Sequence, residues 1–185
     1  MRNLSFFRRS LKDLKTTGTI SRSSPWLCKR MIRMIDFEQA DVIVELGAGD
    51  GVITKHILKQ MKPNAQLYAF ELLDDLAQKM IDDIDDDRLH VIREDVSNVK
   101  EIMADHGIHE LDAVVSAIPF VILPKKKGKS IVTSCMEMMK SGAWYSQVHY
   151  SLLSKKMYEQ VFGNLKMSFV PVNIPPAFAF YCQKT

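Results

Sequence analysis

The pattern of hydrophobic and polar positions divides the chain from residue 41 onward into alternating strands and helices. Short apolar runs predict strands, and segments with apolar residues three and four positions apart predict amphipathic helices. The predicted strands are Val42–Glu45, Gln66–Phe70, Leu89–Arg93, Leu111–Ala117, Ala143–His149, Leu165–Val172 and Ala177–Cys182. The predicted helices are Gly51–Met61, Leu73–Ile81, Val99–His106, Ile131–Lys140, with Gly142 as its C-terminal cap, and Ser154–Phe162. This alternation indicates a doubly wound α/β domain.

The segment before residue 36 has a different pattern, with apolar and basic residues on separate sides of a helix. The apolar stripe is Leu4, Phe7, Leu11 and Leu14, and the basic residues are Arg8, Arg9, Lys12 and Lys15. Such a helix either lies in a membrane interface or packs on its own domain. A second helix is expected from Pro25 to about Ile35, with Ser24 as its N-cap. We therefore divide the chain into helices at 1–35 and an α/β domain at 36–185.

Composition and charge narrow the class of protein only slightly. The chain has 185 residues and a net charge of +3, which suits one mildly basic globular domain. The charge is uneven, because Met1–Arg33 carries many arginines and lysines against Asp13 alone. The three cysteines are far apart and suggest neither a disulfide framework nor a metal site, so we expect a reducing, cytoplasmic environment and no metal. Neither a signal peptide nor a membrane-spanning helix is predicted.

The most informative stretch is VIVELGAGDGVIT, from Val42 to Thr54, where a strand leads into a glycine-rich turn and then a helix. Its glycines allow tight turning and close approach of a ligand to the backbone. The spacing differs from a nicotinamide-binding fingerprint, and Glu45 would repel a pyrophosphate but suits a ligand with a cationic end. The run E-L-G-A-G-D-G matches the first motif of class I S-adenosylmethionine methyltransferases, whose cofactor would contact Glu45, Gly47, Ala48, Gly49 and Gly51.

This resemblance implies a Rossmann-like seven-stranded class I methyltransferase fold with S-adenosyl-L-methionine as cofactor. Its sheet is mostly parallel with an antiparallel C-terminal strand. In this architecture an acid at the end of the second strand binds the ribose hydroxyls, which implies Glu71 followed by Leu72. The end of the third strand is similar to the family's adenine-binding position, which implies Asp95 followed by Val96.

The end of the fourth strand is where the family places the methyl acceptor. Ribosomal RNA adenine dimethyltransferases carry Asn-Leu-Pro-Tyr or a similar motif there, whereas this chain reads Ala117-Ile118-Pro119-Phe120. The polar residue that would accept the adenine amino hydrogen is therefore alanine. Ser116-Ala117-Ile118-Pro119 instead resembles the Ser-Gly-Leu-Pro-like motif of bacterial phospholipid N-methyltransferases, and the stretch Thr16–Ile32 is similar to theirs. This second resemblance implies methylation of a phosphatidylethanolamine-like amine.

A phospholipid offers apolar tails, an anionic phosphate and an amine. The stretch from Pro119 to Lys129 has apolar residues that suit the tails and lysines that suit the phosphate. We expect the apolar run that begins with Phe120 to contact acyl chains, and Lys125, Lys126, Lys127 and Lys129 to attract phosphates. The alternative is that the apolar residues pack inside and the lysines form a solvated loop.

Methyl transfer requires a neutral amine in line with the methyl donor. A carbonyl between Ser116 and Ile118 is a candidate for orienting the amine, and His149 and Tyr150 are candidates for removing its proton. These two residues equally suit plain packing at a strand end.

Two other functions remain open at this point: an adenine N6-methyltransferase of ribosomal RNA, and a non-catalytic S-adenosylmethionine-binding protein. The chain ends after its last strand without the helical domain usual in the RNA enzymes, so we do not expect a nucleic-acid partner. We expect a monomer that contacts an anionic membrane surface peripherally. The pattern does not separate phosphatidylethanolamine from an ornithine lipid, nor does it set the number of methyl groups.

Overall fold

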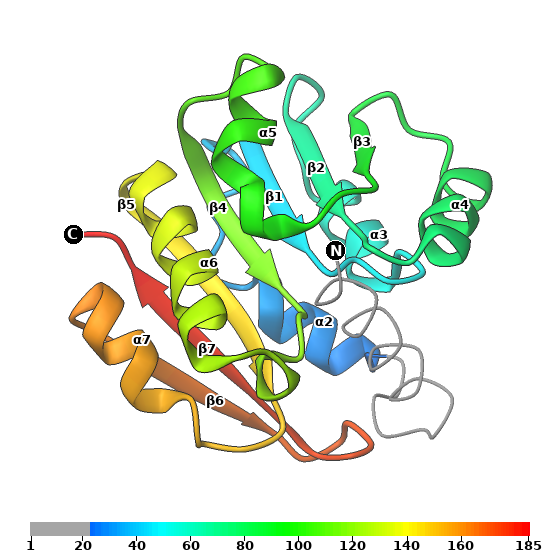
Figure 1. Ribbon diagram of the computed structural model, residues 1–185. Helices are drawn as coiled ribbons and strands as arrows, with labels where there is room; N and C mark the ends of the chain where they lie inside the picture. Colours follow the sequence, from blue (N-terminus) through cyan, green and yellow to red (C-terminus); the bar gives the residue numbers. More distant parts are fainter. Residues whose placement is uncertain (1–22) are drawn as a thin grey trace.

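The computed structural model describes residues 23–185, which form one mixed β-sheet with helices on both faces (Figure 1). The strands are β1 (Val42–Leu46), β2 (Gln66–Phe70), β3 (Leu89–Ile92), β4 (Leu111–Ser116), β5 (Met139–His149), β6 (Lys166–Val170) and β7 (Ala177–Gln183). The helices are α2 (Pro25–Ile32), α3 (Val52–Leu58), α4 (Asp74–Asp83), α5 (Val99–Asp105), α6 (Lys125–Met138) and α7 (Lys155–Phe162), with short 3-10 turns η1 (Val96–Asn98) and η2 (Phe120–Ile122).

The sheet has the order β3-β2-β1-β4-β5-β7-β6. The strands from β3 to β5 pair in parallel, whereas β7 runs antiparallel between β5 and β6. This confirms the fold class expected from the sequence. The chain order reverses direction between β1 and β4, and in such sheets ligands bind beyond the carboxyl ends of the strands at this switch. We call this side of the sheet the carboxyl edge and the opposite side the amino edge.

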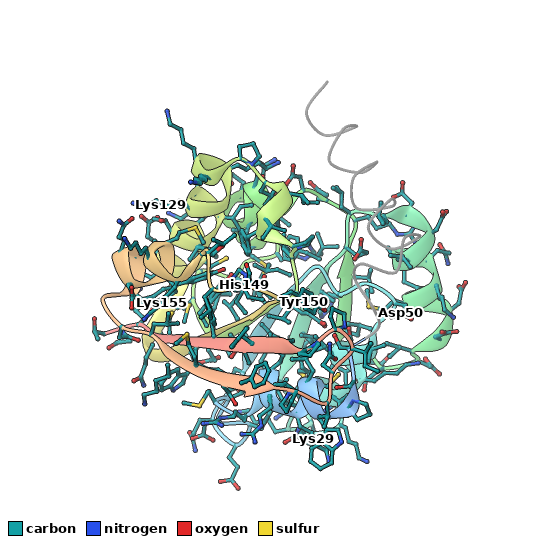
Figure 2. The ribbon with its side chains drawn as sticks, turned by 90° about the horizontal axis from the view of Figure 1, so that it is seen from below. Lys29, Asp50, Lys129, His149, Tyr150 and Lys155 are labelled. Atoms are coloured by element: carbon teal, nitrogen blue, oxygen red, sulfur yellow. The ribbon has the colours of Figure 1, made fainter. Side chains whose placement is uncertain are left out.

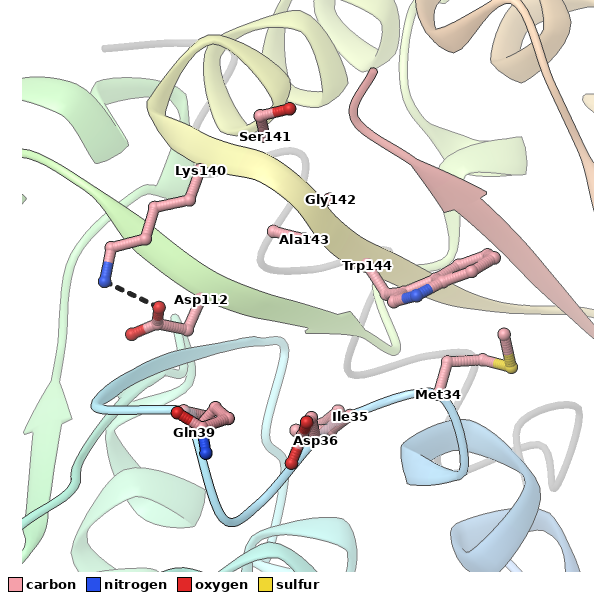
Figure 3. A pocket seen from close by; sticks show the side chains of 11 residues that line it. Met34, Ile35, Asp36, Gln39, Asp112, Lys140, Ser141, Gly142, Ala143 and Trp144 are labelled. Carbon is pink, nitrogen blue, oxygen red and sulfur yellow. Dashed lines mark hydrogen bonds and ion pairs between the residues drawn. The ribbon is translucent and has the colours of Figure 1, made fainter.

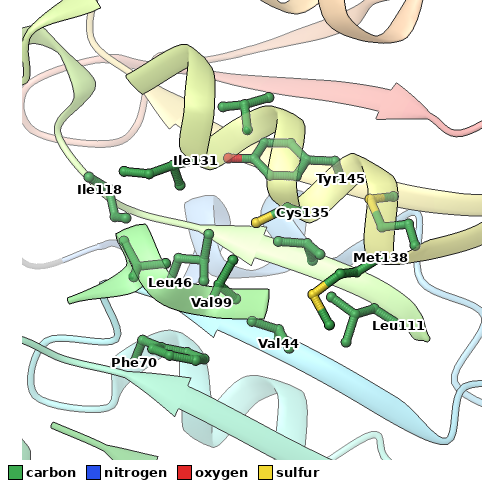
Figure 4. Close-up of a cluster of buried hydrophobic side chains, with 14 of the residues drawn as sticks. Val44, Leu46, Phe70, Val99, Leu111, Ile118, Ile131, Cys135, Met138 and Tyr145 are labelled. Atoms are coloured by element: carbon green, nitrogen blue, oxygen red, sulfur yellow. The ribbon is translucent and has the colours of Figure 1, made fainter. Parts of the chain in front are cut away.

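The two faces of the sheet bury separate cores because alternate residues of a strand point to opposite faces. The face covered by α5, α6 and α7 buries side chains such as Leu46, Phe70, Val99, Cys135 and Tyr145 (Figure 4). The other face is covered by α2 and α3, with Leu27, Ile43 and Ile57 among its buried residues, and α4 packs beside β3. Burial on both faces explains the continuous apolar run of β4.

The lysine-rich stretch is helical, which corrects the predicted start of the helix at Ile131. α6 already begins at Lys125, because Gly128, Ile131, Val132, Cys135 and Met138 recur at helical spacing and are all buried. The predicted cap, Gly142, lies instead inside β5, where the helix has already ended at Met138 and the glycine adopts φ +83°. The register between β4 and β5 shifts between Leu111 and Ala113, so the glycine belongs to an irregular part of the strand.

The start of α2 agrees with its predicted cap. The Ser24 hydroxyl accepts a hydrogen bond from the Leu27 N–H at 3.2 Å, and Pro25 occupies the first turn. The helix ends at Ile32, a few residues before the predicted Ile35. The predicted basic amphipathic helix, with Phe7, Arg8, Arg9 and Leu11, lies outside the described residues. No helix among residues 23–185 is long and apolar enough to cross a membrane.

Candidate active site

The glycine-rich turn joins the carboxyl end of β1 to α3. Gly47, Gly49 and Gly51 all adopt positive φ, at 73°, 64° and 82°, where other residues are strained. The N–H groups of Gly47 and Ala48 both donate to the Phe70 carbonyl, at 2.8 and 3.0 Å. These bonds fix the turn to the end of β2.

The same turn also touches the loop that follows β4. A side-chain carbon at Gly47 would lie 3.2 Å from Ile118 Cγ1 and 3.3 Å from the Ile118 backbone nitrogen. The Ala117 N–H donates to the Leu46 carbonyl at 2.8 Å, which holds the two loops together. We call Ser116–Pro119 the acceptor loop. The predicted cofactor turn and the predicted acceptor position are therefore direct neighbours.

Glu45 is completely buried at the end of β1. Its Oε2 accepts a hydrogen bond from the Thr54 hydroxyl at 2.7 Å, while no described residue donates to its Oε1. Burial raises the pKa of Glu45 to about 8, against the opposing effect of the Thr54 hydrogen bond. A buried oxygen without a donor is costly in a folded protein and is a natural partner for a ligand's ammonium group.

Glu71 connects the glycine turn to the end of β2 from the other side. Its Oε2 accepts from the Gly49 N–H at 2.7 Å, and its Oε1 accepts from the Leu73 N–H at 2.8 Å. Each carboxylate oxygen has further acceptor capacity for a hydroxyl group. Leu72, beside it, is buried. Glu71 is therefore held in a fixed orientation, as a ribose-binding acid requires.

Glu71→Ala is expected to weaken S-adenosylmethionine binding by about 1.5–3 kcal/mol, because the ribose hydroxyls lose a charged acceptor. Calorimetric titration of the purified protein measures this loss. Asp75→Ala, an exposed acid in the first turn of α4, is the matched control and should bind as the wild type does. Wild-type affinity in Glu71→Ala would contradict the assignment of Glu71.

Asp95 lies after β3 and is engaged by groups of the protein itself. Its Oδ1 accepts from the Ser97 N–H at 2.9 Å and the Ser97 hydroxyl at 2.7 Å, while its Oδ2 accepts from Lys127 Nζ at 2.8 Å. Burial alone would raise the pKa of Asp95, but the Lys127 and Ser97 hydrogen bonds lower it overall. Val96 is buried beside it. Asp95 therefore caps the turn at Ser97, in addition to its expected role toward adenine. Its ion pair holds Lys127 next to the expected adenine position.

These features together fit S-adenosylmethionine. The glycine turn leaves no room for a side chain at Gly47, Glu45 offers a buried oxygen without a donor, and Glu71 is fixed with acceptor capacity to spare. Glu45 would hold the cationic amino acid end and Glu71 the ribose hydroxyls. Groups of three or more metal-ligating side chains do not occur among residues 23–185.

The acceptor loop is held by a polar side chain that the sequence pattern did not single out. Gln147 of β5 is fully buried, and its Nε2 donates to the Ile118 carbonyl at 3.0 Å and the Val148 carbonyl at 2.9 Å. Its Oε1 accepts from the Tyr145 hydroxyl at 3.1 Å. Ser116, also buried, lies with its Oγ 3.5 Å from the Ile118 N–H. The available signal was the alternation of Tyr145, Gln147 and His149 on one face of β5.

His149 is buried as well, and its environment argues against a role as general base. Its Nε2 lies 3.0 Å from the Tyr158 hydroxyl, and burial lowers the pKa of the imidazole to about 4. A base with so low a pKa is neutral but weak at physiological pH. Tyr150, the next residue, is exposed at the carboxyl edge, as Figure 2 shows, and burial of part of its ring raises the pKa of its hydroxyl.

The predicted apolar lip is only partly exposed. Phe120 is buried and packs against Tyr158 and His149, with ring centroids 6.5 and 6.4 Å away. Leu123 is buried too, whereas Val121 is 64% exposed and Pro119 is half-buried. This corrects the prediction that Phe120 contacts acyl chains, because the ring fills the space under α6 beside Gly128. The side chains of Lys125 and Lys126 remain exposed.

A pocket of about 340 Å³ lies at the amino edge, far from these groups in the sheet (Figure 3). It is lined by Met34, Asp36, Asp112, Lys140 and Trp144, among others. Lys140 Nζ donates to Asp112 Oδ1 at 2.7 Å, and Asp112 Oδ2 accepts from the N–H groups of Asp41 and Val42. These bonds join the starts of β1, β4 and β5, which gives the charged pair a structural role.

Comparison with known proteins identifies the family and the fold of this chain. The family of ribosomal RNA adenine dimethylases matches residues 23–168. An ornithine lipid N-methyltransferase from Singulisphaera acidiphila is 28% identical over 180 residues, which are 96% of this chain and 94% of the relative.

Two solved structures illustrate the shared fold. One is a putative rRNA methylase from Clostridium thermocellum, with a TM-score of 0.66 and 16% identity over 90% of this chain and 98% of that one. The other is a 16S rRNA methyltransferase from T. thermophilus with AdoMet and guanosine bound, with a TM-score of 0.64 and 14% identity over 89% of this chain and 44% of that one.

Proposed function

Since the chain belongs to the ribosomal RNA adenine dimethylase family and is a class I S-adenosylmethionine-dependent methyltransferase, we propose that its methyl acceptor is the amine of an amino lipid at a membrane surface. The observation that carries this proposal is the acceptor loop, Ser116-Ala117-Ile118-Pro119. A methylase of adenine needs a polar side chain to hold the exocyclic amino group, and Ala117 supplies none. The ornithine lipid relative, which matches this chain over almost its whole length, supports the same acceptor class.

Positioning is the main contribution that this chain makes to the reaction. When bound, S-adenosylmethionine supplies a methyl group on a positively charged sulfur. The Ile118 carbonyl accepts hydrogen bonds from Gln147 Nε2 at 3.0 Å and from the Phe120 N–H at 2.9 Å, and these two bonds fix the acceptor loop against which the amine would be placed. Gly47, packed directly against Ile118, keeps the acceptor loop beside the cofactor turn. The amine would be held by backbone atoms and not by a substrate-specific side chain.

The amine has to lose its proton before it attacks, and the structure favours release to water over transfer to a histidine. His149 is buried, paired with Tyr158 and of low pKa. Its uncharged imidazole adds no positive charge beside the acceptor loop. Tyr150, at the exposed carboxyl edge, lies where the headgroup would meet solvent. We expect the pH dependence of the rate to follow the amine of the lipid and not a histidine of the protein.

Incubation of the purified full chain with radiolabelled S-adenosylmethionine tests the proposal. We expect label in ornithine lipid or phosphatidylethanolamine presented in detergent micelles, and none in 16S ribosomal RNA. Because the relative is named as an ornithine lipid N-methyltransferase, we expect ornithine lipid to be the better of the two substrates. Glu71→Ala serves as the control for cofactor-dependent transfer.

Two results would contradict the lipid proposal. Transfer of label to RNA without transfer to lipid would identify an RNA methylase. Tight cofactor binding without transfer to any acceptor would indicate a binding protein.

A further inference from the structure

Exposed large apolar side chains are concentrated at the carboxyl edge. Two loops carry five of the ten among the described residues: the loop after β5, with Tyr150, Leu152 and Leu153, and the β6–β7 hairpin, with Val172 and Ile174. We call these five residues the apolar rim. Leu153 is 87% exposed and Ile174 is 80% exposed. By contrast, the described loops at the amino edge carry no exposed large apolar residue. Chance exposure would not favour one edge of the sheet, so the rim points to a partner.

The two loops of the apolar rim lie beside one another. β7 pairs with both β5 and β6, and its first residues, Ala177 and Phe178, lie opposite Val170 of β6 and His149 of β5. Adjacent strands are about 4.8 Å apart, so the loops begin about 10 Å from each other. The side chains of Tyr150 and Asn173 also lie close enough for Asn173 to affect the pKa of the Tyr150 hydroxyl.

The β6–β7 hairpin, which carries part of the rim, is fixed by hydrogen bonds of the buried Asn173. Asn173 is fully buried between Val172 and Ile174, its Oδ1 accepts from the Ser24 N–H at 2.9 Å, and its Nδ2 donates to the Pro175 carbonyl at 2.7 Å. The bond to Ser24 also brings the start of α2 to this edge, and Trp26 there is exposed. The apolar side chains therefore project from a fixed hairpin.

Lysines lie beside the apolar rim at the starts of two helices. Both α6 and α7 begin at the carboxyl edge, with Lys125 and Lys126 in the first turn of α6 and Lys155 and Lys156 in the first turn of α7. Neither first turn contains an acid. Figure 2 views this side and shows Lys129 and Lys155 to one side of Tyr150, with Asp50 to the other. A helix start favours anions, so Lys125, Lys126 and Lys156 lower local stability there unless a negative surface faces them, whereas Lys155 also pairs with Glu159 Oε1 at 3.4 Å.

We propose that the apolar rim is the surface through which the protein docks on an anionic lipid bilayer, with the lysines of α6 and α7 facing the lipid phosphates. Side chains such as Leu153 and Ile174 enter the apolar part of the interface. The rim borders the acceptor loop, because β4 and β5 end side by side. Docking would therefore place the acceptor loop next to the lipid headgroups. The proposal rests on the proposed lipid substrate and assigns the membrane contact to residues other than Phe120.

Sedimentation with vesicles of phosphatidylcholine and phosphatidylglycerol in equal parts tests this surface, using the full chain. Leu153→Asp with Ile174→Asp should weaken vesicle binding by about 100-fold. Burial of one aliphatic side chain of this size raises the affinity for an apolar phase by about tenfold or more, and the double variant loses two of them. The matched control is Ile81→Asp with Met167→Asp, which changes two exposed apolar residues away from the carboxyl edge and should bind as the wild type does. High salt should weaken wild-type binding only in part, because salt screens the lysines and not the apolar contact.

Several outcomes would overturn the rim as a docking surface. Wild-type protein that does not bind these vesicles would do so, as would vesicle binding that survives the Leu153 and Ile174 changes. A dimer that becomes monomeric in the rim variant, with vesicle binding unchanged, would show that a second copy covers the rim.

Activity on a short-chain lipid dissolved below its micelle concentration separates this proposal from the proposed function. The rim variant should retain that activity, since no rim residue belongs to the acceptor loop. Absence of lipid methylation in the wild type would refute the substrate while leaving the vesicle result to decide the docking surface.

Discussion

Glu45→Gln is expected to weaken S-adenosylmethionine binding by about 10- to 100-fold at neutral pH and to abolish the release of a proton on binding. The Oε1 atom of Glu45 is buried without a described donor, so an ammonium group placed there gains a charge-assisted hydrogen bond. The uncharged amide of glutamine cannot replace that attraction. The Thr54 hydroxyl can still donate to a glutamine oxygen, so the local fold should persist.

The release of a proton on cofactor binding is expected because the pKa of Glu45 is raised in the free protein. Before binding, burial holds this pKa at about 8, so the carboxyl is mostly protonated at pH 6.5. A bound cation favours the carboxylate, so binding expels the proton, and the affinity of the wild type should rise with pH between about 6 and 8. Calorimetry at pH 6.5 in two buffers of different ionisation enthalpy counts the released proton. Release should approach one proton for the wild type and vanish for Glu45→Gln.

Stability of the cofactor-free protein should change with pH in a related manner. Folding raises the pKa of Glu45 from 4.5 to about 8, so the folded protein binds this proton more tightly than the unfolded chain does. The resulting contribution to the free energy of unfolding is complete below pH 4.5 and is lost as pH rises through about 8. At about 1.4 kcal/mol per pKa unit, the loss is on the order of 5 kcal/mol. Glu45→Gln should therefore become more stable relative to the wild type as pH rises from 5 to 9.

The control for both measurements is Glu101→Gln, an exposed residue of α5. It should leave the affinity, the released proton and the pH dependence of stability unchanged. Equal proton release by wild type and Glu45→Gln would contradict the placement of the cationic end at Glu45.

Gln147→Leu is expected to lower kcat by about 100-fold with little change in cofactor affinity, because Gln147 is a positioning residue for the acceptor loop. Its two N–H donors hold the Ile118 and Val148 carbonyls, and the Tyr145 hydroxyl fixes the amide orientation. Leucine has a similar volume but no donor, so the Ile118 carbonyl would keep only its bond from the Phe120 N–H, and the acceptor loop would be held less firmly beside the amine. A displacement of about 1 Å at a reacting group can cost about 100-fold in rate.

A merely structural role for Gln147 would give a different pattern. Thermal melting compares the loss of stability, and single-turnover kinetics at saturating lipid isolates the transfer step. Gln147→Glu offers a second test, since its protonated form regains one donor, and its rate relative to wild type should rise as pH falls. Gln160→Leu, an exposed residue of α7, is the matched control. Unchanged kcat in Gln147→Leu, or a loss explained wholly by unfolding, would rule out the positioning role.

The sequence by itself determined the sheet, the cofactor turn and the reaction type. Strand and helix periodicities placed most elements to within a few residues, because burial on the two faces of a sheet imposes a local pattern. The run from Glu45 to Gly51 predicted the cofactor through its resemblance to the first motif of class I S-adenosylmethionine methyltransferases, and its glycines adopt the positive φ that such a turn requires. The acid at Glu71 followed from its place at a strand end, since parallel strands bring their carboxyl ends together.

Only the tertiary structure decided what Gln147, Phe120 and the lysines of α6 do. Gln147 meets Ile118 across neighbouring strands from 29 residues away, and the sequence pattern contains no information about that distance. Phe120 was expected at the surface, but α6 starts early enough to cover it. The apolar rim likewise exists because β7 inserts between β5 and β6 and brings Leu153 and Ile174 to the same edge. Local periodicity reports whether a residue is buried in its own element, whereas partners depend on which elements become neighbours.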